Sequence, residues 1–452
     1  MGTSVNDDTP WAGRRLHFVG IGGAGMSGIA LVARALGADV TGSDRAESAY
    51  LTPLRAAGIE PAIGHDAANL PEGDDVELVF STAVGADNPE RALACERGLT
   101  ELHRADVLAE ITSLRPTIAI TGTHGKTTTA AMAVHALRGA GADPGYLVGG
   151  EVRSTGSNAG WGAGEWTVVE ADESDRSMLK LHPAVALVTN VELDHHATYA
   201  SRLDVEEAFA AFLALAPRRI VWDRPQLLEL AVDAGDAEVV AFDAPDAELR
   251  PDGVRFSWRD HDVALTVPGA HNALNAAAAL EACRAAGADL ERAVAALADF
   301  RGAGRRFELL GTTASGAAVY DDYAHHPTEV AATIAAARTL EPGRLVAVFQ
   351  PHLYSRTRGL HREFGAALAD ADVVAVLDVY PARERAEDYP GVSGHLVAAA
   401  AADAAGGRRV YWLPDFAAAE SALRSLLRDG DLCLVMGAGD VDALGRRLVA
   451  RG

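Results

Sequence analysis

Short apolar runs alternate with amphipathic, helix-like segments along most of the chain, and glycine-rich turns join many of them. Residues 14–44 begin the pattern with a strand, a glycine turn, a helix and a second strand, in the sequence RRLHFVGIGGAGMSGIALVARALGADVTGSD. Another apolar run at 117–120 leads through TGTHGKTTT into the helix-like segment AAMAVHALR. Alternating strands and helices are typical of parallel sheets covered by helices. The pattern therefore predicts an α/β protein.

Two interruptions divide this pattern into three domains. Arg115-Pro116 ends the first domain, because the residue before a proline is disfavoured in a helix. A loop at 301–306 marks the second boundary. We predict a Rossmann-like domain at 1–115, a central P-loop ATPase-type α/β domain at 116–306 and a C-terminal Rossmann-like α/β domain at 307–452. Further predicted elements are a strand at 76–84, helices at 88–98, 103–111, near 205–215 and at 271–287, a strand at 220–222 and a β-ribbon at 253–269.

The loop TGTHGKTTT at 121–129 predicts a phosphate cradle. It follows a strand and opens a helix, so its backbone N–H groups point at bound phosphates. Lys126 would reach the β- and γ-phosphates of a nucleotide, and the hydroxyl of Thr127 would hold Mg²⁺. The common form of this motif has glycine where this chain has Ile120. The alternative is a glycine- and threonine-rich turn that binds nothing.

Two later strands carry polar residues toward the same loop. The apolar run 167–169 ends at Glu170, and the run 185–188 leads to Asn190, Asp194, His195 and His196. Strand ends beside a phosphate loop are where metal-holding residues belong. We expect Glu170 to hold a metal, and the other acids of EADESD to be solvated loop charges. The two histidines have an alternative interpretation as residues that cap a turn.

The first glycine turn fits the dinucleotide fingerprint G-x-G-x-x-G. Gly20, Gly22 and Gly25 occupy the glycine positions, and Gly23 leaves more room for a ligand. Asp44 follows at the place of a ribose-binding acid, although a surface turn would also explain it. The fingerprint alone is compatible with NAD, FAD or a nucleoside diphosphate.

The C-terminal domain has many polar side chains where its first two strands end. Such groups gather at the carboxyl ends of parallel strands when a ligand binds there. They are Asp321, Asp322, Tyr323, His325 and His326 after one strand, and Gln350, His352, Tyr354, Ser355, Arg356 and Arg358 after the next.

Composition limits the partners of the chain. The formal net charge of −23 argues against a nucleic-acid or anionic-membrane binder, because the summed field repels polyanions. Lys126 and Lys180 are the only lysines, which makes a lysine in the phosphate loop more informative. Cys95, Cys283 and Cys433 are far apart and are expected to be buried free thiols. The N-terminus lacks the apolar region of a signal peptide, and no apolar run reaches the ~18 residues of a membrane span. We therefore expect a cytoplasmic protein.

Two nucleotide sites and an arginine-bearing third domain favour a particular kind of chemistry. Hydride transfer has no use for a Lys-Thr phosphate loop, so a dehydrogenase is disfavoured. A nucleotide-linked substrate, ATP and an anionic co-substrate would together suit activation of a carboxylate by phosphorylation before amide formation. A nucleotide-regulated binding module without ligase chemistry is the alternative from another class.

The sequence resembles the Mur ligase family from about residue 14 to residue 445. Ten motifs in order carry the resemblance, and the family also lacks the first glycine of the loop, in agreement with Ile120. The motifs are VGIGGAGMSGIA, HRADVLAE, TGTHGKTTT, EADESD, NVELDH, HNALNA, RRFE, DDYAHHPTE, FQPHLYSRT and MGAGD.

The resemblance implies an ATP-dependent carboxylate–amine ligase of peptidoglycan precursor synthesis. Its motifs look most like the branch that joins L-alanine to the lactyl carboxylate of UDP-N-acetylmuramate through an acyl phosphate. The alternative within the family is a recycling ligase that joins a whole murein peptide to the same sugar nucleotide. The implied cofactors are ATP and Mg²⁺, with two ions expected and Mn²⁺ able to substitute. A monomer or weak homodimer with no nucleic-acid or membrane partner is expected.

The resemblance also implies roles for individual residues. Lys126, His195, Arg306 and Asp322 are the expected catalytic residues. ATP would be bound by Gly122, Thr123, His124, Gly125, Lys126, Thr127, Thr128, Asn272, Asn275 and Arg306, and metal ions by Thr127, Glu170 and His195. The sugar nucleotide would lie against Gly20, Gly22, Gly23, Gly25, Ser43, Asp44 and Ser81, and the amino acid against Tyr323, His352 and Arg356.

Leu353 stands where some relatives carry arginine, which leaves Arg356 less help in holding a carboxylate. The chain has no lysine after Lys180, so a carbamylated lysine beyond that position is excluded. His352 is a candidate base for the amine, and His195, His325 and His326 are not distinguished from it.

Overall fold

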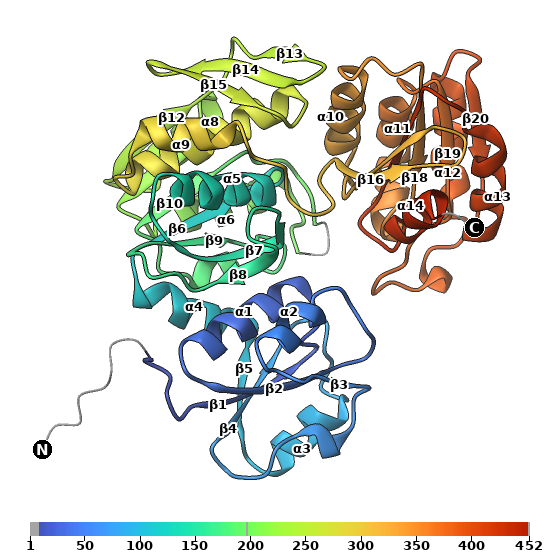
Figure 1. Cartoon of the computed structure of the whole chain (residues 1–452). Helices are drawn as coiled ribbons and strands as arrows, with labels where there is room; N and C mark the ends of the chain where they lie inside the picture. Colours follow the sequence, from blue (N-terminus) through green and yellow to red (C-terminus); the bar gives the residue numbers. More distant parts are fainter. Residues whose placement is uncertain (1–8, 196–197, 451–452) are drawn as a thin grey trace, which may run out of the picture. The chain divides into compact units, whose positions relative to one another are not determined.

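The computed structural model describes residues 9–195 and 198–450 and has the predicted α/β fold (Figure 1). The chain forms two compact units. The first contains the residues up to Asp243 together with Ala276–Ala296, and the second contains Ala244–Asn275 and the residues from Leu297 onward. The domain boundaries at residues 115 and 306 remain predictions. His196 and the N-terminal segment up to residue 8 lie outside the described residues.

The N-terminal domain is a five-stranded parallel sheet with the order β3-β2-β1-β4-β5. Apolar strand residues such as Leu16 and Phe18 are fully buried in its core. The first strand leads directly into the glycine loop, as the hydrophobic pattern predicts. The elements are β1 (Arg15–Val19), α1 (Ala24–Ala35), β2 (Asp39–Asp44), α2 (Leu51–Ala56), β3 (Ala62–Ile63), η1 (Ala67–Asn69), β4 (Val76–Phe80), α3 (Pro89–Glu96), β5 (Thr100–His103) and α4 (Arg104–Leu114).

The central domain is a seven-stranded sheet with the order β12-β11-β10-β6-β9-β7-β8, in which only β8 runs antiparallel to its neighbour. β6, the strand before the phosphate loop, lies between β10 and β9. Each of its residues is buried, which explains its uninterrupted apolar pattern. The elements are β6 (Thr117–Thr121), α5 (Lys126–Gly139), β7 (Gly145–Val152), β8 (Ser157–Gly160), β9 (Thr167–Glu170), η2 (Ser177–Lys180), β10 (Val185–Val188), α6 (Arg202–Leu213), β11 (Arg218–Trp222), α7 (Pro225–Asp233) and β12 (Glu238–Phe242).

Helix α1 joins the N-terminal sheet to the central one (Figure 1). The Asn158 side chain of β8 donates a hydrogen bond of 2.6 Å to the carbonyl of Ala24 and contacts Ser27. A Cβ atom on Gly28 would lie 3.2 Å from the Cβ of Ala159, so this helix packs closely against β8. The helix that follows the glycine loop is therefore anchored on the central domain.

The C-terminal sheet has the order β16-β17-β21-β18-β19-β20 and is parallel except for the edge strand β16. β17 and β18, the strands expected to carry the polar clusters, are both next to β21. The elements of this sheet and its helices are β16 (Glu308–Thr312), β17 (Ala318–Asp322), α10 (Pro327–Arg338), β18 (Arg344–Phe349), α11 (Tyr354–Leu368), β19 (Val373–Val376), η3 (Ala386–Asp388), α12 (Gly394–Ala404), β20 (Arg409–Trp412), α13 (Phe416–Leu426), β21 (Asp431–Met436) and α14 (Asp442–Val449). Before them in the chain, β13 (Glu248–Arg250), β14 (Gly253–Trp258) and β15 (His261–Leu265) form a separate three-stranded antiparallel sheet, and α8 (Ala270–Ala285) and α9 (Leu290–Leu297) follow it.

Two glycines of α11 should respond oppositely to alanine. A Cβ on Gly365 would lie 2.5 Å from the backbone carbon of Ala400 in α12, so Gly365→Ala is expected to lower the free energy of unfolding by about 1–3 kcal/mol. Gly359 has open space around it, and Gly359→Ala should raise that free energy by roughly 0.5–1 kcal/mol through helix propensity. Urea unfolding of both variants checks this pair. Equal destabilisation would contradict the close packing of α11 on α12.

The cysteine prediction is partly wrong. Cys283 and Cys433 are buried, and burial raises the pKa of each thiol to about 12. Cys95 is exposed instead, because it lies on the outward face of α3 while its neighbour Ala94 is buried.

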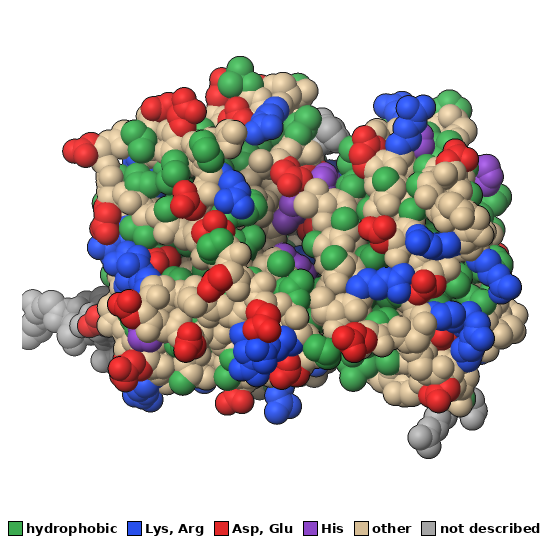
Figure 2. All heavy atoms as spheres, turned by 90° about the horizontal axis from the view of Figure 1, so that it is seen from above, with side chains coloured by type: hydrophobic (Ala, Val, Ile, Leu, Met, Phe, Trp, Pro, Cys, Tyr) green, Lys and Arg blue, Asp and Glu red, His purple; other side chains and the backbone are tan. Residues whose placement is uncertain are grey.

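The surface mixes both signs of charge. Figure 2 shows acidic and basic side chains interspersed on the visible face, so the net charge of −23 is not gathered into one patch on that face. Within the part of the chain that the structure describes, no helix is both long and apolar enough to cross a membrane.

Candidate active site

The phosphate loop has the geometry of a cradle at the start of α5. Gly125 precedes the helix with φ 83°, and Gly122 has φ 136°, a conformation that glycine adopts without a side-chain clash. A Cβ on Gly122 would lie 2.0 Å from Oγ1 of Thr189. Among the described residues, no side chain caps α5, so the N–H groups of its first turn face the loop. Ile120 is a buried residue of β6 that pairs with Leu187 and Glu170, and strand packing explains why glycine is absent there.

Lys126 is folded over this loop. Its Nζ donates to the carbonyl oxygens of Gly122 at 2.6 Å and Thr123 at 3.1 Å, and to Glu173 at 3.0 Å. Burial alone would lower the pKa of Lys126, but the carboxylates of Glu173 and Glu170 outweigh it and raise the pKa above its usual value. The ammonium group therefore remains charged at the mouth of the cradle.

Thr127 and Glu170 meet as expected. The Thr127 hydroxyl donates to Oε1 of Glu170 at 3.0 Å, and the N–H of Gly149 donates to Oε2 at 2.6 Å. Thr127 is the second residue of α5, which follows β6, and Glu170 ends β9, so the adjacent strands β6 and β9 bring the two side chains together. A hydroxyl and a carboxylate are hard oxygen donors of the kind that Mg²⁺ prefers.

Glu173 is the central residue that the sequence interpretation missed. It was expected to be a solvated loop charge, and that expectation is wrong because its side chain is 2% exposed. Its carboxylate contacts Lys126, and Oε1 lies 3.1 Å from Nε2 of His195. Glu173 follows the strand end by three residues, and only the folded turn directs it back toward α5. The cluster of acids in EADESD, in a chain with only two lysines, was the available signal.

The polar residues that follow β10 also lie around the cradle. Asn190 accepts a hydrogen bond from the N–H of His124 at 2.9 Å and donates to its carbonyl at 3.0 Å, which fixes the loop. His195 has φ 54°, and its backbone N–H donates to Oδ1 of Asp194 at 2.7 Å. The structure thus brings Lys126, Thr127, Glu170 and His195 into one cluster.

The glycine loop of the N-terminal domain is held by Asp44. Oδ2 of Asp44 accepts the N–H of Gly22 at 2.8 Å, and Ser48 donates to the carbonyl of Gly22 at 2.9 Å. Gly20 has φ 80°, which permits the turn after β1. Asp44 therefore shapes the loop, in addition to any contact with a ligand. Among the described residues, no side chain caps the start of α1.

Ser43 points into the domain toward the buried Glu90. Its hydroxyl donates to Glu90 at 2.7 Å, and the ring of His17 lies 2.8 Å from the same carboxylate. Burial opposes ionisation of Glu90, but hydrogen bonds from His17, Ser43 and Asn69 outweigh it and lower its pKa. No hydrophobic pattern marks this group, so sequence reasoning missed it.

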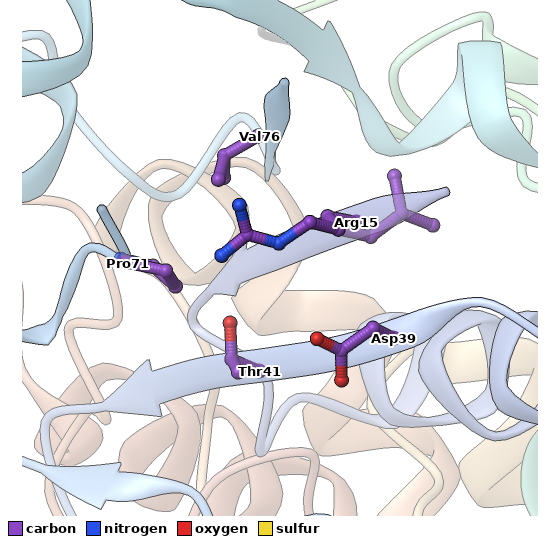
Figure 3. A pocket seen from close by; sticks show the side chains of 6 residues that line it. Arg15, Asp39, Thr41, Pro71 and Val76 are labelled. Carbon is purple, nitrogen blue, oxygen red and sulfur yellow. The ribbon is translucent and has the colours of Figure 1, made fainter. Parts of the chain in front are cut away.

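A cavity of about 30 Å³ lies on the same domain, away from the glycine loop (Figure 3). Arg15, Asp39, Thr41, Pro71 and Val76 surround it. The first residues of β1, β2 and β4 contribute to it, whereas ligands of parallel sheets bind at the carboxyl ends of the strands. Its volume suits about one water molecule.

Asp322 is buried at the end of β17. It accepts the N–H groups of Phe307 and Ala324, both at 2.8 Å. Burial raises the pKa of its carboxyl, and the nearby Arg306 opposes that rise. The Arg306 guanidinium lies over the ring of Tyr323, 5.2 Å from its centroid. The structure therefore brings together Asp322, Arg306 and Tyr323.

The predicted amino-acid residues form a second cluster in the same unit. Nδ1 of His352 lies 3.3 Å from Nη1 of Arg356, and the His352 ring stacks on Tyr380. The His325 ring lies between Tyr323 and His352, with centroid distances of 5.3 Å and 6.1 Å. His325 and Tyr380 therefore belong to this cluster as well.

Leu353 has an unusual backbone conformation next to this cluster. Its φ is 69° and ψ 133°, and its side chain is only 8% exposed. A non-glycine residue in such a region costs about 1–3 kcal/mol and needs support from its surroundings. Its N–H donates to the carbonyl of Tyr380 at 3.0 Å, which ties the start of α11 to the segment that carries Tyr380.

Asn272 and Asn275 are three residues apart on α8 and so share one face of it, and both are buried. Nδ2 of Asn272 donates to the carbonyl of Pro268 at 2.7 Å, and Nδ2 of Asn275 lies 3.3 Å from Oδ1 of Asn272. Because both are buried and one donates to the other, they are not ordinary exposed polar residues.

Asp321 should give stability an unusual pH dependence. Burial raises its pKa to about 6 from 3.8, although Arg305 opposes the shift. The folded protein then binds this proton more tightly than the unfolded chain, so its stabilising contribution is complete below pH 3.8 and is lost as the pH rises through about 6. Relative to Asp321→Asn, the native protein should lose unfolding free energy between pH 4 and pH 7.

Asp431 provides a control of opposite sign. Burial opposes its ionisation, but Arg344 lowers its pKa overall, so its contribution is present at neutral pH and is lost in acid. Relative to Asp431→Asn, the native protein should therefore gain stability as the pH rises. Urea unfolding of the three proteins at several pH values measures both trends. Parallel curves for all three would contradict the prediction.

The fold and the site define a three-domain, nucleotide-using enzyme. Family models match residues 15–115 as the Mur ligase family catalytic domain, 120–283 as the Mur ligase middle domain and 305–439 as the Mur ligase glutamate ligase domain. The chain belongs to the Mur ligase family.

Individual members of the family with high similarity to the chain are alanine ligases. The chain is 44% identical to UDP-N-acetylmuramate–L-alanine ligase of Rubrobacter xylanophilus, covering 97% of this chain and 100% of that protein. It is also 44% identical to the enzyme of the same name from Mycolicibacterium smegmatis, with coverage of 97% and 95%. The crystal structure of UDP-N-acetylmuramate-alanine ligase MurC from Thermotoga maritima matches with a TM-score of 0.81 at 29% identity, covering 96% of this chain and 98% of that one.

Proposed function

We propose that this chain is an ATP-dependent ligase that joins L-alanine to the lactyl carboxylate of UDP-N-acetylmuramate, in peptidoglycan precursor synthesis. Its 44% identity to alanine ligases over nearly the full length carries this proposal. The cluster of Lys126, Thr127, Glu170, Glu173 and His195 at the phosphate loop supports it, because such a cluster suits phosphoryl transfer.

The reaction proceeds in two steps. A carboxylate oxygen of UDP-N-acetylmuramate attacks the γ-phosphorus of ATP, the bond to the β-bridging oxygen breaks, and ADP leaves with an acyl phosphate formed. The amine of L-alanine then attacks the acyl carbon, a proton leaves the nitrogen, and phosphate departs to give the amide. Lys126 steadies the negative charge of the phosphoryl group, because its raised pKa keeps it protonated.

Thr127 and Glu170 would hold one metal ion, and His195 would hold a second. The oxygen donors of the first pair are 3.0 Å apart at the cradle, and the ring of His195 reaches the same acidic cluster. Mg²⁺ bound there would neutralise phosphate charge, and Mn²⁺ is expected to replace it.

The remaining roles divide among the three domains. The glycine loop, Asp44 and Ser81 would hold the sugar nucleotide. Asn272, Asn275, Arg306 and Asp322 would serve ATP, and Tyr323, His352 and Arg356 would hold the amino acid. We expect a cytoplasmic monomer or weak homodimer.

Phosphate release tests the proposal. ATP is supplied with UDP-N-acetylmuramate and, in separate reactions, L-alanine, L-serine, glycine or a murein tripeptide, and products are identified by mass. Release should require both the sugar nucleotide and L-alanine. Release without either of them would overturn the ligase function.

The recycling ligase is the second candidate within the family. The murein peptide ligase of Psychrobacter arcticus matches this chain with a TM-score of 0.72 at 25% identity, covering 96% of this chain and 98% of that one. Both values are lower than for the alanine ligase structure. Preference for the tripeptide over L-alanine in the same assay would favour this second function.

A further inference from the structure

Arg104 joins the N-terminal domain to the acidic loop of the central domain. It is the first residue of α4, and its side chain is 14% exposed. Its Nη2 donates to Oδ2 of Asp172 and to Oδ2 of Asp175, both at 2.8 Å. One guanidinium nitrogen thus holds two carboxylates of the loop that also carries Glu173.

The opposite edge of the same guanidinium lies beside the glycine loop. A Cβ on Gly25 would lie 3.5 Å from Nη1 of Arg104. Gly25 is in the first turn of α1, where backbone N–H groups have no helical partner. Throughout the described ranges, Nη1 and Nε of Arg104 make no hydrogen bond. These donors therefore face the place where the diphosphate of the sugar nucleotide would bind.

The acidic loop connects this edge to the ATP cradle. Oδ1 of Asp172 accepts the N–H of Ser174 at 2.9 Å, which shapes the turn around Glu173. The Tyr199 hydroxyl donates to the carbonyl of Glu173 at 2.6 Å, and Thr198 donates to that of Ser174 at 2.6 Å. The side chain of Glu173 then contacts Lys126 and His195. A shift of Asp172 or Asp175 would move the anchor of Lys126.

We propose that Arg104 is a positioning residue that couples sugar-nucleotide binding to the ATP cradle, by holding the acidic loop with Nη2 and the bound diphosphate with Nη1. This inference rests on the proposed function and adds a residue and a coupling to it. A guanidinium is a rigid plane with donors on separate edges, so a second anion orders it without displacing the first. The coupling is therefore positive: the sugar nucleotide strengthens nucleotide binding at Lys126.

A purely structural role for Arg104 makes a different prediction. Lys180 in η2 forms an ion pair with Asp106, which also lies on α4, and so it joins the same two domains. Lys180 touches neither the glycine loop nor Glu173. Lys180→Met is therefore a matched control for loss of one domain contact.

The test measures ADP binding by titration calorimetry, with and without UDP-N-acetylmuramate, in full-length protein. In the native chain the sugar nucleotide should tighten ADP binding about 10-fold. Arg104→Lys keeps a cation for the two acids but has no second nitrogen for the diphosphate, so sugar-nucleotide affinity should fall about 10-fold and the coupling should fall below about 2-fold. Lys180→Met should keep both native values.

Asp175→Asn is a second variant that leaves the N-terminal domain unchanged. It should keep the affinity for UDP-N-acetylmuramate and lose the coupling to ADP binding. This result would distinguish the contact of Nη2 with the acidic loop from that of Nη1 with the diphosphate. The variant also tests the inference if Arg104→Lys folds poorly. Native coupling in both variants, or no coupling in the native chain, would overturn the inference. Failure of the native chain to bind UDP-N-acetylmuramate at all would instead overturn the proposed function.

Discussion

Replacing Lys126 by methionine is expected to lower phosphate release with all three substrates present by about 10³-fold. The Lys126 ammonium lies at the mouth of the cradle, where it donates to the carbonyl of Gly122 and to the carboxylate of Glu173. Methionine keeps the length and the helix propensity of the residue but removes the charge that stabilises the transferred phosphoryl group. The loss should therefore appear mainly in kcat.

Only one other lysine exists in this chain, and it supplies the control. Lys180→Met makes the same chemical change at a residue that is 50% exposed and paired with Asp106. It should keep near-native phosphate release. Retention of more than about a tenth of the activity by Lys126→Met would contradict a role in phosphoryl transfer.

Replacing Glu173 by glutamine is expected to lower kcat by about 10²-fold, with a smaller change in the KM for ATP. Glutamine keeps the shape of the side chain but removes the charge that Lys126 and His195 contact. Glu173 is also a main reason why the pKa of Lys126 is raised against the effect of burial. Without it, the pKa of Lys126 should be lower than in the native enzyme.

The pH profile of kcat distinguishes this role from a general loss of stability. In Glu173→Gln the fall of kcat on the alkaline side should begin at lower pH than in the native enzyme. Glu151→Gln, at an exposed acid of the same domain, should leave the profile unchanged. If Glu173→Gln lowers kcat but leaves the alkaline fall of kcat at the native pH, Glu173 does not control the charge of Lys126.

Local pattern was sufficient for the elements around the phosphate loop and for the residues that directly end them, but it did not identify β5, β7 or β8. β6, the phosphate loop and α5 follow from one apolar run, two glycines and an amphipathic segment, and the structure has them at the predicted place. Thr127 and Glu170 meet because adjacent parallel strands end at the same edge of a sheet. The same rule brings Tyr323 and His352 into one cluster through the neighbours of β21.

The local sequence pattern could not predict the burial and partners of side chains whose position depends on a turn or on distant residues. Glu173 and the other acids of EADESD have the same hydrophilic character in sequence, yet only Glu173 is 2% exposed and directed at Lys126. Cys95 was mistaken for a buried thiol because helical periodicity does not state which face a short helix turns to the core. Glu90 is buried among polar partners from several strands, and no window of sequence contains them together.

The sequence by itself determined the α/β class, the two glycine loops and the family, because hydrophobic period and motif spacing are properties of contiguous residues. Only the tertiary structure decided which charges are paired and buried. Arg104 lies far from Asp172 and Asp175 along the chain, and Lys126 lies far from Glu173, yet each pair is within 3.0 Å once the strands and helices pack. Contacts of this kind depend on which strands become neighbours and how each loop turns.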